Sequence, residues 1–152
     1  MGIYSQIIES EKKGRKLFSI LIDPDKQTEG NLLQIIEKSK SSNVDFFFIG
    51  GSLLTNNSLD SCISTIKQNC KIPVILFPGN AIHLNDKVDG ILFLSLISGR
   101  NAEMLIGNHV ITAPILKECD IEVLSTGYML IDSGESTSVS YMSNTTPIPH
   151  DK

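Results

Sequence analysis

Residues 44–52 read Val-Asp-Phe-Phe-Phe-Ile-Gly-Gly-Ser, an apolar run that ends abruptly in two glycines and a serine. Successive residues of a strand point to opposite faces of the sheet, so a run that is apolar at every position is typical of a parallel strand covered on both faces. Four further apolar runs flank it, within residues 17–22, 72–77, 90–96 and 121–131. Helix-like or turn-like segments separate the five runs, and this alternation predicts a parallel α/β protein.

Helical patterns fill most of the connections. Residues 3–8 suggest a short amphipathic helix, and Thr28 and Ser58 are placed to cap helices before the second and third strands. Asn101 opens a longer helix that Pro114 should kink or end. We expect its apolar side chains to lie on one side, namely Met104, Leu105, Ile111, Ile115 and Leu116.

Three segments look unusual. Residues 78–89 are too short and polar for a full crossover helix, so we expect a turn or about one helical turn there. The fifth strand should break or bend near Thr126-Gly127. Residues 132–152 are rich in Ser, Thr, Gly and Pro and are expected to form a long loop without a helix or strand.

Composition bounds the class of protein. A length of 152 residues suits one domain and falls short of the roughly 250 residues of an eight-stranded α/β barrel. The net charge of −4, without a basic stripe, gives no support for nucleic-acid binding. The three cysteines share no metal-type spacing, and Cys62 fits a buried helix position. We expect reduced thiols, a cytoplasmic protein, and neither a signal peptide nor a membrane span.

Several strands end in residues that can do chemistry. Asp23-Pro24-Asp25-Lys26 could hold Mg²⁺ and a phosphorylated ligand, with Asp23 the better metal ligand, or could form a turn in which Asp25 caps the next segment. Gly50-Gly51-Ser52 could bring backbone N–H groups close to a phosphate, or could be an ordinary turn.

Other candidates stay equally open. Arg100 could face a diphosphate, or be a solvated arginine at a helix start. Tyr128 could point into a barrel mouth or pack in the core, and Asp132 follows its strand as Asp23 does. His109 is interpreted as a packing residue on its helix.

Taken together, six segments carry a family resemblance. The chain closely resembles the geranylgeranylglyceryl phosphate synthase family of prenyltransferases, and most of all its second, longer group. The matching segments, in order, are LIDPDK (21–26), GGSLL (50–54), ILFPGN (75–80), ILFLSLISGRN (91–101), TGYMLID (126–132) and YMSNTTPIP (141–149).

The resemblance implies a fold, an activity and some site residues. It implies a TIM (β/α)8-barrel-like fold, here an N-terminal partial barrel of about five parallel strands. It implies transfer of a polyprenyl group, typically geranylgeranyl, from its diphosphate to the 3-hydroxyl of sn-glycerol 1-phosphate, assisted by Mg²⁺. Asp23 and Ser52 match the family's metal-site residues, and Tyr128 matches a tyrosine near the glycerol phosphate. No residue is assigned as catalytic.

The resemblance also implies that family members continue through three more strands. We therefore expect residues 1–152 to be a partial barrel domain without strands six to eight, inactive alone and homo-oligomeric when full length. Peripheral contact with a membrane surface is expected at most. The alternatives are a non-catalytic remnant or interaction module that folds only with a partner, and an unrelated phosphate-binding half barrel.

Overall fold

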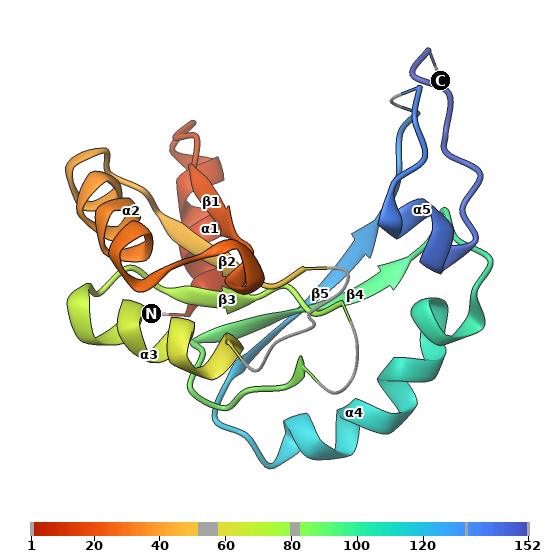
Figure 1. Cartoon of the computed structure of the whole chain (residues 1–152). Helices are drawn as coiled ribbons and strands as arrows, with labels where there is room; N and C mark the ends of the chain where they lie inside the picture. Colours follow the sequence, from red (N-terminus) through yellow and green to blue (C-terminus); the bar gives the residue numbers. More distant parts are fainter. Residues whose placement is uncertain (1, 52–57, 80–82, 133, 152) are drawn as a thin grey trace.

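One parallel sheet forms the centre of the molecule. The computed structural model describes residues 2–51, 58–79, 83–132 and 134–151. Within them the strands pair in the order β1-β2-β3-β4-β5, each neighbouring pair parallel. Their bounds are β1 Ser19–Ile22, β2 Phe46–Ile49, β3 Val74–Leu76, β4 Gly90–Leu96 and β5 Glu122–Tyr128. The predicted α/β partial barrel with five parallel strands is confirmed (Figure 1).

Helices occupy the connections between the strands. Their bounds are α1 Ile3–Lys12, the 3-10 helix η1 Pro24–Lys26, α2 Glu29–Ser41, α3 Leu59–Asn69, the π-helix η3 Glu103–Gly107, α4 Asn108–Lys117 and α5 Ser138–Ser143. The predicted cap at Thr28 is confirmed, because its hydroxyl accepts a hydrogen bond from the Asn31 amide. Ser58 is the N-cap residue of α3 as predicted, but its side chain does not cap the helix. Its backbone is already helical, and its hydroxyl donates to the Asp25 carboxylate at 2.9 Å instead.

Two apolar clusters cover the two faces of the sheet. On one face, Ile49 and Leu76 belong to a buried cluster that includes Ile36 of α2 and Ile63 of α3. On the other face, a second cluster unites Ile3 of α1 with side chains of three strands, namely Phe46, Ile75 and Leu124. Since neighbouring strand residues point to opposite faces, the continuous apolar runs of the sequence are explained by burial on both sides.

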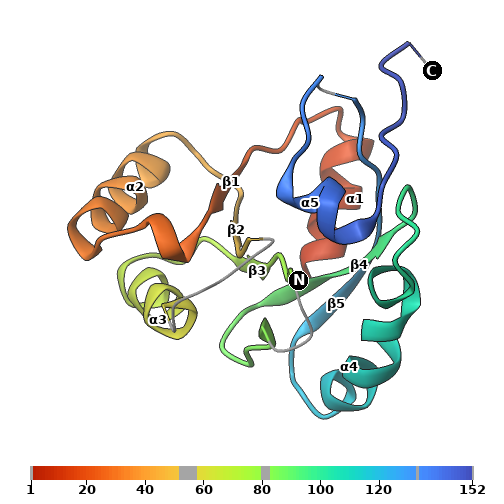
Figure 2. The same cartoon turned by 45° about the vertical axis from the view of Figure 1, so that its right-hand side comes forward.

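Helix α1 is tied to the first residue of β5. The amides of Ile3 and Tyr4, at the start of the helix, donate to the Glu122 carboxylate. Gly2, the N-cap residue, offers no side chain for this purpose. A carboxylate at a helix N-terminus satisfies free N–H groups and interacts favourably with the helix dipole. The contact therefore holds α1 across the sheet from β1 to β5 (Figure 2).

The sheet opens between β3 and β4. Strand β4 pairs with β5 over seven residue pairs but with β3 over only two, Ile75↔Gly90 and Leu76↔Ile91. Beyond Ile91, β4 continues to Leu96 without a β3 partner. Of residues 78–89, the described part contains no long helix, in line with the prediction.

Two expectations for the last third of the chain are wrong. Strand β5 does not break near Thr126-Gly127, because Thr126 and Gly127 keep their pairing with β4. Residues 132–152 are not a loop throughout, since they contain α5 and an isolated parallel bridge between Ile131 and Ile148. A capping box between Thr137 and Ser140 starts α5, which explains how so polar a segment forms a helix.

The apolar face predicted for the helix after Asn101 is wrong for Ile111 and Ile115, although Leu116 is buried and Met104 lines a cavity. The π-helical turn η3 places an extra residue in one turn and shifts the inward face of the helical turns after it. Residues facing inward are four apart, and Thr112 and Leu116 are buried while Ile111 and Ile115 are exposed. Pro114 does not end the helix, which continues to Lys117.

Candidate functional site

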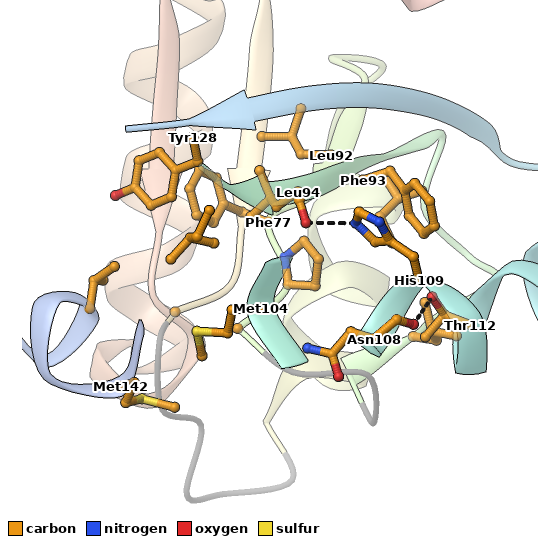
Figure 3. A pocket seen from close by; sticks show the side chains of 17 residues that line it. Phe77, Leu92, Phe93, Leu94, Met104, Asn108, His109, Thr112, Tyr128 and Met142 are labelled. Carbon is orange, nitrogen blue, oxygen red and sulfur yellow. Dashed lines mark hydrogen bonds between the residues drawn. The ribbon is translucent and has the colours of Figure 1, made fainter. Parts of the chain in front are cut away.

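An apolar cavity lies where β3 and β4 separate. The space inside it that can hold the centre of a water molecule is about 80 Å³, and seventeen residues line it (Figure 3). Gly51, after β2, and Phe77, after β3, form one end of the lining. Strand β4 contributes Leu92 and Leu94, and β5 contributes its last residue, Tyr128. Because the strands are parallel, the carboxyl ends of all five lie at one edge of the sheet, which is where such folds bind ligands.

The wall on the helix side is built from η3, α4 and α5. Met104 and Met142 contribute flexible thioethers, which adapt to irregular apolar ligands. His109 Nε2 lies 2.8 Å from the Leu94 carbonyl oxygen, a hydrogen bond drawn in Figure 3. The His109 ring also stacks on Phe93 with centroids 4.2 Å apart. Because β4 has no β3 partner at this height, His109 satisfies a strand carbonyl, in agreement with its interpretation as a packing residue.

Three aromatic rings form a row near the carboxyl ends of the strands. The rings of Phe48 and Phe77 lie 6.3 Å apart between centroids, and those of Phe77 and Tyr128 lie 5.9 Å apart in an edge-to-face arrangement. Only Phe77 and Tyr128 line the cavity among these three. The Tyr128 ring packs against Phe77 and lines the cavity.

Gly50 brings the end of β2 against the end of β3. Its φ is 145°, and a Cβ placed on it would lie 2.0 Å from the Phe77 carbonyl oxygen. The Gly50 amide donates to the Ile22 carbonyl at 3.1 Å. This amide is therefore already used in the sheet, whereas the next residue, Gly51, lines the cavity.

Asp23 sits at the end of β1 as predicted. One carboxylate oxygen accepts the Asp25 amide at 3.2 Å, and the other lies 3.0 Å from the Lys26 ammonium. The side chain is 27% exposed, so its oxygens keep access to solvent. The Asp-Pro-Asp turn exists, but Asp23 rather than Asp25 caps it. Ser52, the second predicted metal residue, lies outside the described residues.

The sequence named Asp25 within the Asp23-Pro24-Asp25-Lys26 cluster but did not single out His83 for this site. The Ser58 hydroxyl donates to Asp25, which joins η1 to the start of α3. Burial lowers the pKa of His83 and the charge of Asp25 opposes that shift, so the two side chains lie within electrostatic reach. Asp25 stands two residues from Asp23, but nothing in the sequence indicated that His83 would approach it. Within the described ranges, no three His, Cys, Asp or Glu side chains gather closely enough to bind a metal by themselves.

Arg100 and Asp132 have local partners. The Arg100 guanidinium donates to the Gly99 carbonyl at 2.8 Å, and its amide donates to the Ser143 carbonyl. The Asp132 carboxylate accepts the Gly134 amide at 2.8 Å in a local turn. Arg100 thus lies where α5 meets the end of β4, beside rather than inside the cavity wall.

This arrangement defines a class of protein. A parallel sheet with helices in its connections and an apolar cavity at the carboxyl ends of its strands are features of a (β/α)-barrel fold. The chain belongs to the PcrB family, whose sequence model matches residues 6–152. The family resemblance inferred from the six segments is confirmed.

Curated relatives share one name. A geranylgeranylglyceryl phosphate synthase of Chitinophaga pinensis is 50% identical over 150 residues, which are 99% of this chain and 60% of that protein. A synthase of the same name from Spirosoma linguale is 52% identical over 139 residues, which are 91% of this chain and 56% of that protein. The chain thus spans about 60% of the length of the relatives it matches.

Solved structures show the same fold. The (S)-3-O-geranylgeranylglyceryl phosphate synthase of Thermoplasma acidophilum, crystallised with its substrate sn-glycerol-1-phosphate, superposes with a TM-score of 0.91 at 29% identity, covering 100% of this chain and 61% of that one. The wild-type GGGPS of Thermoplasma volcanium gives a TM-score of 0.86 at 28% identity, covering 98% of this chain and 59% of that one.

Proposed function

We propose that this chain forms part of a Mg²⁺-dependent prenyltransferase of the geranylgeranylglyceryl phosphate synthase type. The reaction joins a polyprenyl diphosphate to a hydroxyl of sn-glycerol 1-phosphate and forms an ether-linked lipid precursor. The observation that carries the proposal is the apolar cavity that begins at Gly51. A prenyl tail needs an apolar cavity, and its diphosphate needs backbone N–H groups and cationic or metal partners at the cavity mouth.

The residues at the mouth fit a magnesium ion shared with substrate. Mg²⁺ is held typically by one or two carboxylates together with substrate phosphates and water. Asp23 supplies one accessible carboxylate, and Lys26, which pairs with it, is 78% exposed at its side chain and free to turn toward a phosphate. When bound, magnesium would offset the negative charge that grows on the leaving diphosphate.

The chain's own residues would bind and orient. Gly51 presents backbone close to the diphosphate, and Lys26 adds a cation once the diphosphate displaces Asp23 as its partner. The side chains of β4 and α4 keep water from the prenyl tail. Tyr128 is proposed to contact the glycerol phosphate from the end of β5, where its ring packs against Phe77 and lines the cavity.

A binding experiment tests this function on the chain as it is. Calorimetric titration with geranylgeranyl thiolodiphosphate, an unreactive analogue, should show binding that Mg²⁺ strengthens. Asp23→Asn should remove most of that Mg²⁺ effect, about tenfold in Kd if one charged ligand is lost. The matched control is Asp60→Asn, an exposed carboxylate of α3 paired with Lys87, which should keep the effect. Equal losses in both variants, or no binding, would contradict the proposal.

Other properties follow only as proposals. All three cysteines are free, which suits a cytoplasmic protein. No helix in the described ranges is long and apolar enough to cross a bilayer. The apolar side chains of Leu21 in β1 and Ile131 after β5 are each more than half exposed. These edges favour coverage by further chain or by another subunit, which is also what a non-catalytic interaction module would need.

A further inference from the structure

Phe77 lies at the boundary between the polar mouth and the apolar cavity. Its carbonyl is packed against Gly50, and its ring and Gly51 line the same end of the cavity. A prenyl diphosphate with its diphosphate at Gly51 and its tail among the β4 side chains must therefore pass the Phe77 ring near its first carbon. This step rests on the proposed function.

Positive charge at that carbon would find few partners in the cavity. Among the described lining residues none carries a carboxylate. Aromatic faces attract a cation through the negative potential above the ring, and Phe77, Phe93 and Tyr128 line the cavity. The Phe93 face is covered by the stacked His109 ring. Phe77 is the aromatic lining residue whose backbone contacts Gly50, the neighbour of Gly51 in the sequence.

We propose that the Phe77 ring stabilises the cationic carbon of the prenyl group during transfer. In this step the bond between C1 and the diphosphate oxygen breaks, and its electron pair leaves with the diphosphate. The hydroxyl oxygen of the glycerol phosphate supplies the electron pair of the new C–O bond, and its proton passes to the departing diphosphate. Phe77 is then a catalytic residue, because its ring contacts the reacting carbon while the charge develops.

A pair of ligands that differ only in charge tests the proposal. Farnesyl trimethylammonium places a fixed cation at the C1 end, and its neutral isostere has carbon in place of nitrogen. Both are titrated into the chain without diphosphate, whose charge would itself favour the ammonium. The wild-type chain should prefer the ammonium by about 2- to 30-fold, the range of a cation–π contact. Phe77→Leu should abolish this preference, keep the affinity for the neutral ligand, and be rescued by Phe77→Tyr.

The control is Phe48→Leu. Phe48 belongs to the same row of rings, 6.3 Å from Phe77, but does not line the cavity, so its loss should leave the preference unchanged. If both ligands bind without a preference, or if Phe48→Leu removes the preference as well, the role of Phe77 is wrong while the tail cavity stands. If neither ligand binds the wild-type chain, the proposed function fails together with this inference.

Discussion

Gly50 and the Phe77 carbonyl are in such close contact that no side chain fits between them. A Cβ on Gly50 would lie 2.0 Å from that oxygen, and the φ of 145° is a conformation that residues with a side chain rarely adopt. The contact joins the ends of β2 and β3, which carry the mouth of the cavity. A single glycine therefore sets the distance between Gly51 and the Phe77 ring.

Gly50→Ala should destabilise the fold and disturb the mouth of the cavity together. We expect a loss of roughly 2–4 kcal/mol in the free energy of unfolding, from backbone strain and displacement of the Phe77 carbonyl. Urea denaturation measures it. The control is Gly30→Ala, since Gly30 lies in α2 with no heavy atom within 4 Å of the added Cβ. That variant should be neutral or slightly stabilising because alanine favours helix. Equal stability of the two variants would show that β2 and β3 can move apart freely.

The Asp45 carboxylate should matter more than an exposed carboxylate. One oxygen accepts the Phe18 amide at 2.8 Å, the other pairs with Arg15, and the residue is only 9% exposed. Asp45→Ala leaves the Phe18 amide without a side-chain partner and should cost about 1–3 kcal/mol. Asp60→Ala, which removes an exposed pair with Lys87, should leave the urea midpoint unchanged. An Asp45→Ala chain with the wild-type urea midpoint would show that the contacts of Asp45 with Phe18 and Arg15 do not stabilise the fold.

The strands were predictable because burial on both sheet faces leaves a strong pattern. Each of the five apolar runs contains the strand seen, and β4 agrees at both ends. The interior of the helix after Asn101 was not predictable, because the π-helical turn shifts the buried face without any change in composition. Helix α5 was missed since its signal is a single capping box between Thr137 and Ser140, within a segment of turn-forming residues.

The site was predictable only in part. Asp23 could be placed at a strand end because its position follows from chain order alone. Tyr128 was expected inside the fifth strand and is the last residue of β5. The cavity itself depends on how far β3 and β4 separate, and pairing lengths are not encoded in a local pattern. The contact of His109 with the Leu94 carbonyl follows from the same separation. Ser52 remains a prediction from the family resemblance.

Cys62 should be the least reactive thiol. Burial in the core raises its pKa to about 11, and it is 4% exposed, whereas Cys70 and Cys119 are partly exposed. Alkylation needs the thiolate, so at pH 8 iodoacetamide should modify Cys62 at least about tenfold more slowly than Cys119. Peptide mass spectrometry after timed quenching measures each site, and full unfolding in guanidinium should equalise the rates. Labelling of Cys62 as fast as Cys119 in the native chain would contradict its burial.

The same shift predicts a loss of stability at high pH. The folded chain holds the Cys62 proton more tightly than the unfolded chain, whose thiol keeps the ordinary value of 9.0. The stabilisation is therefore complete below pH 9 and declines as the pH rises toward 11. Cys62→Ala should flatten this part of the pH profile of the urea midpoint, even though it lowers stability at every pH by leaving a small cavity. Parallel profiles for the two chains would exclude Cys62 as the cause.

His109 should decide whether the wall of the cavity stays in place. Its ring satisfies the Leu94 carbonyl and covers Phe93, so His109→Ala removes both contacts from the unpaired part of β4. We expect about 1–3 kcal/mol of destabilisation and weaker binding of geranylgeranyl thiolodiphosphate, measured by urea denaturation and by titration. His109→Gln keeps an N–H donor on a flat side chain and should recover most of the affinity. A matched comparison is His150→Ala, on an exposed residue near the end of the chain, which should change neither quantity. If His109→Ala lowered stability but left affinity intact, the carbonyl contact would be needed for folding alone, and β4 would hold its half of the cavity through its seven pairs with β5.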